Sequence, residues 1–186
     1  LLYPAFGHAV LARGERGKAN QIQAHLHYSG NWGHDHLDVL NLIFWAHEGE
    51  LLSDVGYAHT YRMFADRSSG HNLVVVDRLY QGTGLDSPGD LVGWYPSEHD
   101  AQVVEVSAPD AYAQCSTYRR ALFLLPVDEA STLVLDVFDV AGGAVHEWMA
   151  QGSCMVEGTL DVSCPTTFLA DSYADDGSPF TPPPSS

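Results

Sequence analysis

The sequence predicts an all-β protein, built as an antiparallel β-sandwich of many short strands. Short segments with a period of two recur along the chain, and turn-forming residues bound each of them. We find no convincing stretch of the 3.6-residue period that marks an amphipathic helix. The chain has 186 residues, enough for about one domain with its own core. Many short strands separated by turns indicate a sandwich or a barrel.

The first half of the chain supplies five expected strands. They cover residues 9–12, 21–28, 39–45, a strand that starts at residue 51, and 72–77. The run 39–45 is almost continuously apolar, which is typical of a buried strand. Glu48-Gly49-Glu50 then predicts a hairpin into the next strand.

The second half supplies four more expected strands, each bounded by Pro, Gly or Asp. They cover residues 101–106, 116–125, 132–140 and 145–149. The last eight residues (PFTPPPSS) are rich in Pro and Ser, as in a linker or a disordered end. We therefore expect one β-sandwich domain over residues 1–178 and a disordered tail over residues 179–186.

The charge and hydropathy patterns argue against two classes of protein. Lys and Arg number 8 against 24 Asp and Glu, a net charge of −16 with histidine neutral. A nucleic-acid-binding protein would carry a basic footprint instead, so we expect no nucleic-acid partner. Apolar runs such as 121–127 are far shorter than the roughly 20 residues of a membrane-spanning helix, so we also expect no membrane span.

The densest chemical segment is Gly33-His34-Asp35-His36-Leu37-Asp38. In a strand, residues two apart share a face, so His34 and His36 would point the same way. Neutral imidazole suits zinc and other borderline ions. Asp54 on the next strand and His71 at the start of a later strand can reach the same place. Three ligands from three neighbouring strands would leave a fourth position for water.

Each of these residues also has an ordinary structural interpretation. An H-x-H pair in a β-protein is only a weak indication of metal binding or catalysis. Asp54 stands two residues before Gly56, so it can simply initiate a turn. His71 follows Ser-Ser-Gly and can be a loop residue. We interpret His25 and His27, a second H-x-H pair, as ordinary strand residues.

Two other metal sites can be compared with the same segment. A cupin would place a glutamate about four residues after H-x-H, where this chain has Leu40-Asn41, so that match fails. A facial-triad iron site uses H-x-D, which His36-Leu37-Asp38 fits. It needs a distal His99 or His146 followed shortly by an arginine, and the sequence has no such arginine. The iron alternative is therefore weak.

Taken together, three segments resemble the heparinase II/III-like polysaccharide lyases. Residues 33–38 (GHDHLD) match the pattern G-H-x-H-x-D, and residues 51–56 (LLSDVG) match L-L-x-D-x-G. Residues 69–77 (SGHNLVVVD) are similar to H-N-T-V-V-V-D-G. Segments near residues 6–11, 118–120, 136–143 and 146–147 also fit, so the resemblance covers roughly residues 3–155.

The resemblance implies a fold, an activity and a set of site residues. Family members have an N-terminal α/α-toroid followed by a β-sandwich, and they cleave uronic-acid polysaccharides such as heparan sulfate or alginate by β-elimination. The implied zinc ligands are His36, Asp54 and His71. His34 matches the histidine that faces the substrate, and Tyr57 and Tyr61 fall where family members carry active-site tyrosines.

The resemblance also implies what this chain lacks. The toroid carries the family's tyrosine base, a further histidine and most basic contacts to the acidic polysaccharide, and we expect it to be missing here. We therefore expect a mainly structural zinc that organises His34, little lyase activity from the chain alone, and a secreted, periplasmic or cell-surface location, although no signal peptide is recognisable. Two alternatives stay open: a non-catalytic, metal-stabilised glycan-binding module, and a degenerate structural fragment without metal.

Overall fold

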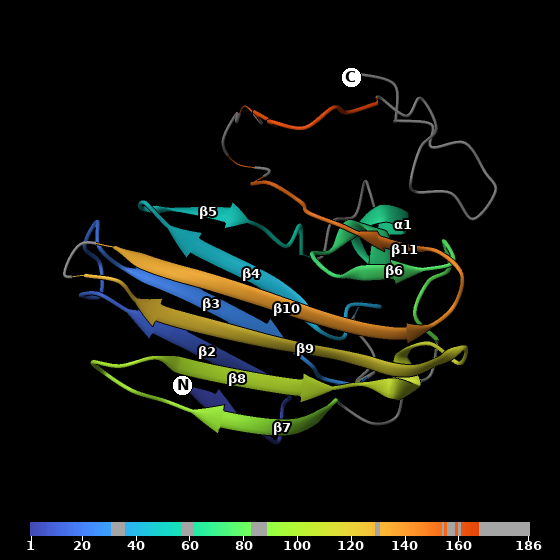
Figure 1. Cartoon of the computed structure of the whole chain (residues 1–186), viewed down its shortest axis with the longest axis horizontal. Helices are drawn as coiled ribbons and strands as arrows, with labels where there is room; N and C mark the ends of the chain where they lie inside the picture. Colours follow the sequence, from blue (N-terminus) through green and yellow to red (C-terminus); the bar gives the residue numbers. More distant parts are fainter. Residues whose placement is uncertain are drawn as a thin grey trace.

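The computed structural model describes residues 1–30, 36–56, 62–82, 89–128, 131–153, 155, 159 and 161–167. Within them the chain forms two main antiparallel sheets and a small two-stranded one (Figure 1). The first sheet, in spatial order, consists of β1 (Leu2–Tyr3), β2 (His8–Arg13), β3 (Ile22–His27), β4 (Asn41–Ala46) and β5 (Gly49–Leu52). The second consists of β10 (Thr132–Gly142), β9 (Cys115–Pro126), β8 (Gln102–Ser107) and β7 (Asp90–Tyr95).

The remaining elements lie together at one end of the sandwich (Figure 1). They are the small sheet of β11 (His146–Trp148) and β6 (Val74–Val76), the helix α1 (Arg62–Ala65), and the 3₁₀ turns η1 (Ser68–Gly70) and η2 (Pro109–Ala111). β6 and β11 pair antiparallel, with Val75 opposite Glu147. This end matters because the chain enters β4, leaves β5 and enters β6 here.

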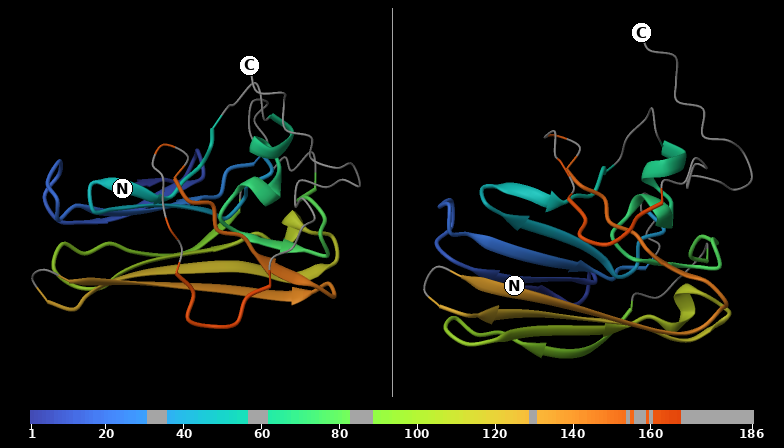
Figure 2. Two further views of the ribbon diagram at one scale, coloured as in Figure 1. Left: turned by 90° about the horizontal axis from the view of Figure 1, so that it is seen from above. Right: turned by 45° about the horizontal axis from the view of Figure 1, so that its top comes forward.

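The two main sheets stack face to face, and their inner side chains form the core (Figure 2). Strand β3 shows the pattern: Ala24 and Leu26 are fully buried, whereas the alternating His25 and His27 are only partly buried. Such alternation is what a sheet with one buried face requires. The central core residues are Ala9, Leu11, Ala24, Leu26, Leu42, Val104, Val106, Tyr118, Leu122 and Leu124.

The predicted all-β sandwich is confirmed, and every expected strand has a counterpart. The β4–β5 hairpin forms around the predicted Glu48-Gly49-Glu50 turn. Strand β7 was not predicted, because Gly93 interrupts its pattern where the pairing with β8 shifts register. The expected strand 72–77 is regular only over Val74–Val76.

Beyond the sandwich, the described residues after Trp148 contain no strand. The expected tail over residues 179–186, and the expected boundary at residue 178, lie outside the described residues. No helix among the described residues is long and apolar enough to span a membrane.

Candidate metal centre

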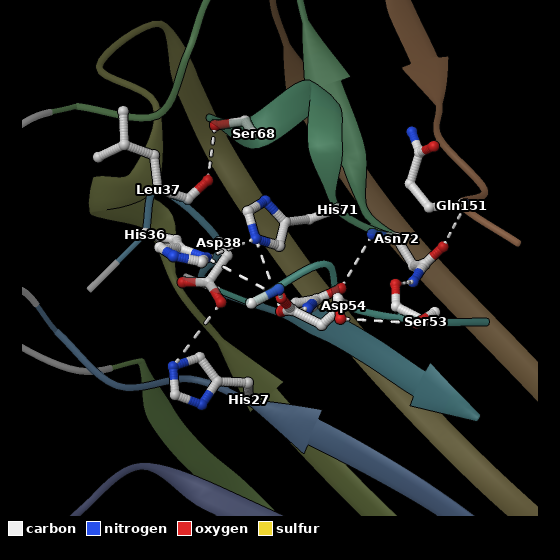
Figure 3. Close-up of polar contacts among 12 residues, drawn as sticks. His27, His36, Leu37, Asp38, Ser53, Asp54, Ser68, His71, Asn72 and Gln151 are labelled. Atoms are coloured by element: carbon white, nitrogen blue, oxygen red, sulfur yellow. Dashed lines mark hydrogen bonds and ion pairs between the residues drawn. The ribbon is translucent and has the colours of Figure 1, made fainter. Parts of the chain in front are cut away.

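Four side chains converge at the end of the sandwich that carries α1 and β6 (Figure 3). They are His36, Asp38, Asp54 and His71, and each offers one ligand atom within 4.8 Å of the others. Three of them are the ligands that the sequence predicted. They do not lie on three neighbouring strands, however. His36 and Asp38 precede β4, Asp54 follows β5, and His71 lies between η1 and β6, so the group is built from loops.

The antiparallel hairpin explains why distant loops meet. Because β4 and β5 run in opposite directions, the start of β4 and the end of β5 lie at the same end of the sheet. The segment before β6 joins them through the amide of Leu42, which donates to the carbonyl of Asn72 at 3.2 Å. Main-chain pairing therefore brings together residues that are up to 35 positions apart, as the contact between His36 and His71 shows.

His71 is oriented for ligation by a backbone contact on its far side. Its side chain is fully buried, and Nδ1 lies 2.8 Å from the carbonyl oxygen of Arg67. A carbonyl can only accept, so Nδ1 carries the proton and Nε2 keeps its lone pair. Nε2 faces Nδ1 of His36 at 3.1 Å and Oδ2 of Asp54 at 3.6 Å. Two nitrogens bound tetrahedrally to one zinc ion would lie about 3.3 Å apart.

Asp54 is held by a donor on each carboxylate oxygen. Asn41 Nδ2 donates to Oδ2 at 2.9 Å, and the amide of Gly56 donates to Oδ1 at 2.7 Å. Gly56 has φ of 66°, a conformation that glycine adopts readily, and this turns its amide back toward the carboxylate. Asp54 therefore forms the turn that the sequence predicted, and its carboxylate also belongs to the candidate metal centre.

Two buried asparagines connect the three loops. Asn41 Oδ1 accepts from the amide of Asn72 at 2.9 Å, and Asn72 Nδ2 donates to the carbonyl of Ser53 at 2.9 Å. The amide of Gln151 donates to Asn72 Oδ1, which ties the segment after β11 to the same network (Figure 3). Both asparagines are fully buried, so these bonds are shielded from water. Sequence reasoning did not single out either asparagine.

Asp38 is the fourth member of the group, and the sequence analysis did not include it among the expected zinc ligands. Its side chain is almost fully buried, and Oδ2 lies 3.9 Å from Nε2 of His27. The H-x-D spacing was the signal, but the facial-triad interpretation paired it with the wrong partners. Among the described residues, His99 is exposed beside Ser97, and His146 is exposed with its Nε2 on the carbonyl of Gly142, so neither belongs to the group. The distal histidine that the iron-triad interpretation named is therefore not part of this group.

The chemistry of the group fits a metal ion. Two imidazoles and two carboxylates meet in a largely buried place, where the side chains of His36 and Asp54 are only 11% and 18% exposed. Buried carboxylates are expensive unless they are paired or bind a cation. Mixed nitrogen and oxygen donors suit zinc and neighbouring ions of the first transition row. The arrangement can therefore hold a divalent cation.

The residues expected to act on substrate lie outside the described residues. This applies to His34, Tyr57 and Tyr61. Two of them are close in sequence to described members of the group, since His34 stands two residues before His36 and Tyr57 three residues after Asp54.

A second histidine cluster lies on the outer face of the first sheet. His8 Nε2 is 3.2 Å from His25 Nδ1, and His8 Nδ1 is 3.4 Å from His27 Nδ1. Burial, and then the neighbouring His27 and His25, lower the pKa of His8 to about 4. Burial also lowers the pKa of His25. His25 and His27, interpreted as ordinary strand residues, thus form a hydrogen-bonded chain with His8 that ends 3.9 Å from Asp38.

The fold and the site together define a class of protein: an antiparallel β-sandwich that carries a group of His and Asp side chains at one end. No family model matches the chain. A curated protein called alginate lyase, from Stenotrophomonas maltophilia (strain K279a), is 26% identical over 155 residues. That alignment covers 73% of this chain and 20% of that protein.

Among solved structures, the fold matches the crystal structure of heparinase III with a TM-score of 0.55. The identity is 14%, so the match shows the shared fold, and it covers 75% of this chain and 22% of that one. The chain thus spans about a fifth of the length of each of these two proteins. The sequence match supports the relationship to polysaccharide lyases that the motifs indicated, and the structural match shows the shared fold.

Proposed function

We propose that the chain is the β-sandwich portion of a polysaccharide lyase. Its substrate is a uronic-acid-containing polysaccharide, heparan sulfate-like or alginate-like, and the reaction is β-elimination. The observation that carries this proposal is the convergence of His36, Asp54 and His71. These residues come from the three segments that resemble the lyase motifs, in a chain whose fold and sequence are related to such enzymes.

The ion proposed for the group is Zn²⁺, in a mainly structural role. His36, Asp54 and His71 would hold it, and Asp38 supplies a fourth protein ligand within reach. Structural zinc sites are typically closed by four protein ligands, whereas catalytic sites keep an open position. When bound, zinc supplies a fixed positive charge that holds the three loops together. His34, two residues from His36, would thereby be kept in place.

β-Elimination requires three catalytic functions from the protein. The uronate carboxylate must be neutralised, a base must remove the C5 proton, and an acid must protonate the departing 4-oxygen. Histidine and tyrosine do such proton transfers when they lie within hydrogen-bond reach. We assign His34 to the carboxylate or the proton, and Tyr57 and Tyr61 to the active site as further tyrosines beside the tyrosine base that we expect from the toroid. His34 stands two residues before the proposed ligand His36, and Tyr57 and Tyr61 stand three and seven residues after the proposed ligand Asp54.

An N-terminal α/α-toroid of the same protein would complete the site. With a net charge of −16, the sandwich alone repels an acidic polysaccharide. The basic contacts to substrate must then come from a partner domain, and the chain's small share of the length of its relatives agrees with this. By the same relationship we propose a secreted, periplasmic or cell-surface location.

The test is release of unsaturated uronate from alginate and from heparan sulfate. We expect release by the longest natural form of the protein, little or none from this chain alone, and loss of release on His34→Ala. His99→Ala serves as the control, because His99 is exposed and outside the group. Robust release by the isolated chain would overturn the toroid proposal. An unchanged His34→Ala enzyme would remove the assignment of His34, and a long form that binds glycan without cleaving it would favour the binding module.

A further inference from the structure

A buried arginine contacts two of the loops that form the candidate metal centre. Arg120 is on β9 in the second sheet, its side chain is 0% exposed, and it points into the space between the sheets. Asp136 on β10 binds it with both oxygens, at 2.9 Å to Nε and 2.7 Å to Nη2. The guanidinium also lies over the ring of Phe138, 5.0 Å from its centroid. Its charge and orientation are therefore fixed from the second sheet.

The free edge of this guanidinium reaches the first sheet. Nη1 donates to two backbone carbonyls, that of Leu40 at 2.6 Å and that of Asn72 at 2.5 Å. Leu40 lies two residues after Asp38, and Asn72 directly follows His71. Leu40 has φ of 70°, which is rare for a side chain of its size. One donor atom thus holds both loops that carry the histidine ligands.

We propose that Arg120 is the positioning residue of this metal centre, acting through the carbonyls of Leu40 and Asn72; the inference rests on the proposed metal site. The connection continues to a ligand: Asn41, next to Leu40, donates to Asp54 and accepts from the amide of Asn72. A planar guanidinium with several donors can bond a carboxylate on one side and carbonyls on the other, which an ammonium cannot copy. Asp136 and Arg120 therefore set the spacing of the ligand loops.

This role is separable from general stabilisation of the fold. Metal affinity measured where the apoprotein is fully folded does not depend on global stability, but it does depend on how well the ligands are placed. Loss of an outer partner of a metal site typically weakens binding by about 10- to 100-fold. A change in affinity and in ligand geometry, without unfolding, is therefore the signature of a positioning residue.

The experiment compares two pairs of variants, each pair an arginine of β9 and the carboxylate that it binds on a neighbouring strand. Asp136→Asn and Arg120→Lys alter the buried pair. Glu105→Gln and Arg119→Lys alter its neighbour, an ion pair whose Arg119 side chain is 43% exposed. For each protein, Zn²⁺ affinity is measured by competition with a chelating dye, and the Co²⁺-loaded form gives an absorption spectrum that reports ligand geometry. Circular dichroism of the apoprotein verifies folding. Asp136 is partly exposed and its replacement is isosteric, so Asp136→Asn decides the matter if Arg120→Lys does not fold.

We expect Asp136→Asn and Arg120→Lys to weaken Zn²⁺ binding at least about tenfold and to change the Co²⁺ spectrum, while the control pair leaves both unchanged. Equal affinity and identical spectra in Asp136→Asn and the parent would overturn the inference, and so would equal losses in the control pair. A parent protein that binds neither ion overturns the metal proposal itself and this inference with it. Tight binding by the parent with unaffected variants overturns the inference alone.

Discussion

His71 illustrates how much of the site is decided by single contacts. The carbonyl of Arg67 fixes which ring nitrogen carries the proton, and the buried position fixes the direction of the other. The sequence motif identified His36, Asp54 and His71, because their order and spacing are distinctive. It did not identify Asp38 as a fourth member of the group, because the resemblance implied only three zinc ligands and Asp38 was considered for an iron site alone. The bend before β4, with the amide of Asn41 bonded to the carbonyl of Asp38, cannot be inferred from alternation.

Asn41 is the residue whose loss should affect both the fold and the metal centre. Asn41→Ala removes the donor to Asp54 and leaves the buried amide of Asn72 without its acceptor. An unsatisfied buried donor costs about 1–3 kcal/mol, so we expect a loss of that size in the free energy of unfolding, measured with urea. Asn20→Ala is the control, because Asn20 is exposed and its side chain accepts a hydrogen bond from the amide of the equally exposed Glu15. Equal stability of the two variants would contradict the network described above.

His8 should make stability depend on pH. Its folded-state pKa is lowered from 6.5 to about 4, so between these values the unfolded chain binds a proton that the folded chain does not. Stability should therefore fall as the pH drops from about 6.5 to about 4 and then level off. Urea midpoints across this range should fall less steeply in His8→Gln than in the parent, and His99→Gln should behave like the parent. Parallel curves for His8→Gln and the parent would show that His8 titrates normally.

At the scale of elements, the loops at one end of the sandwich contain the residues of the candidate metal centre. Alternation and turn residues were enough to predict the β4–β5 hairpin and the long strands β9 and β10. They did not reveal β7, where Gly93 breaks the pattern, or α1 and η1, which are too short to show a helical period. The proposed ligands lie outside the strands, so strand prediction alone could not place them.

Gly70 ends η1 immediately before His71, and it has no room for a side chain. A Cβ there would lie 2.3 Å from the carbonyl oxygen of Phe64 in α1, so η1 would have to shift. Overpacking of this kind costs about 1–3 kcal/mol, and we expect Gly70→Ala to unfold at correspondingly lower temperature and to bind Zn²⁺ more weakly. Gly49→Ala, where a Cβ meets nothing within 4 Å, is the matched control. An unchanged thermal midpoint and affinity in Gly70→Ala would show that η1 does not position His71.

At the scale of the molecule, both main sheets contribute residues that hold the candidate metal centre in place. The first sheet and the segment before β6 provide the ligand loops. The second sheet contributes Arg120, which bonds these loops, and Asp136, which binds Arg120. Composition and motif order were sufficient to predict the sandwich and its relationship to lyases. They could not predict the connection through Arg120, because one arginine within a strand carries no pattern that distinguishes it from Arg119 beside it.

The central claim is that this chain binds one metal ion at the group of His36, Asp38, Asp54 and His71. Elemental analysis of the purified chain tests it most directly, with His36→Ala as the disruptive variant and His99→Ala as the control. We predict about one zinc per chain in the parent and the control. In His36→Ala we predict loss of zinc together with a lower thermal midpoint. Zinc retained in His36→Ala, or absent from the parent, would contradict the account.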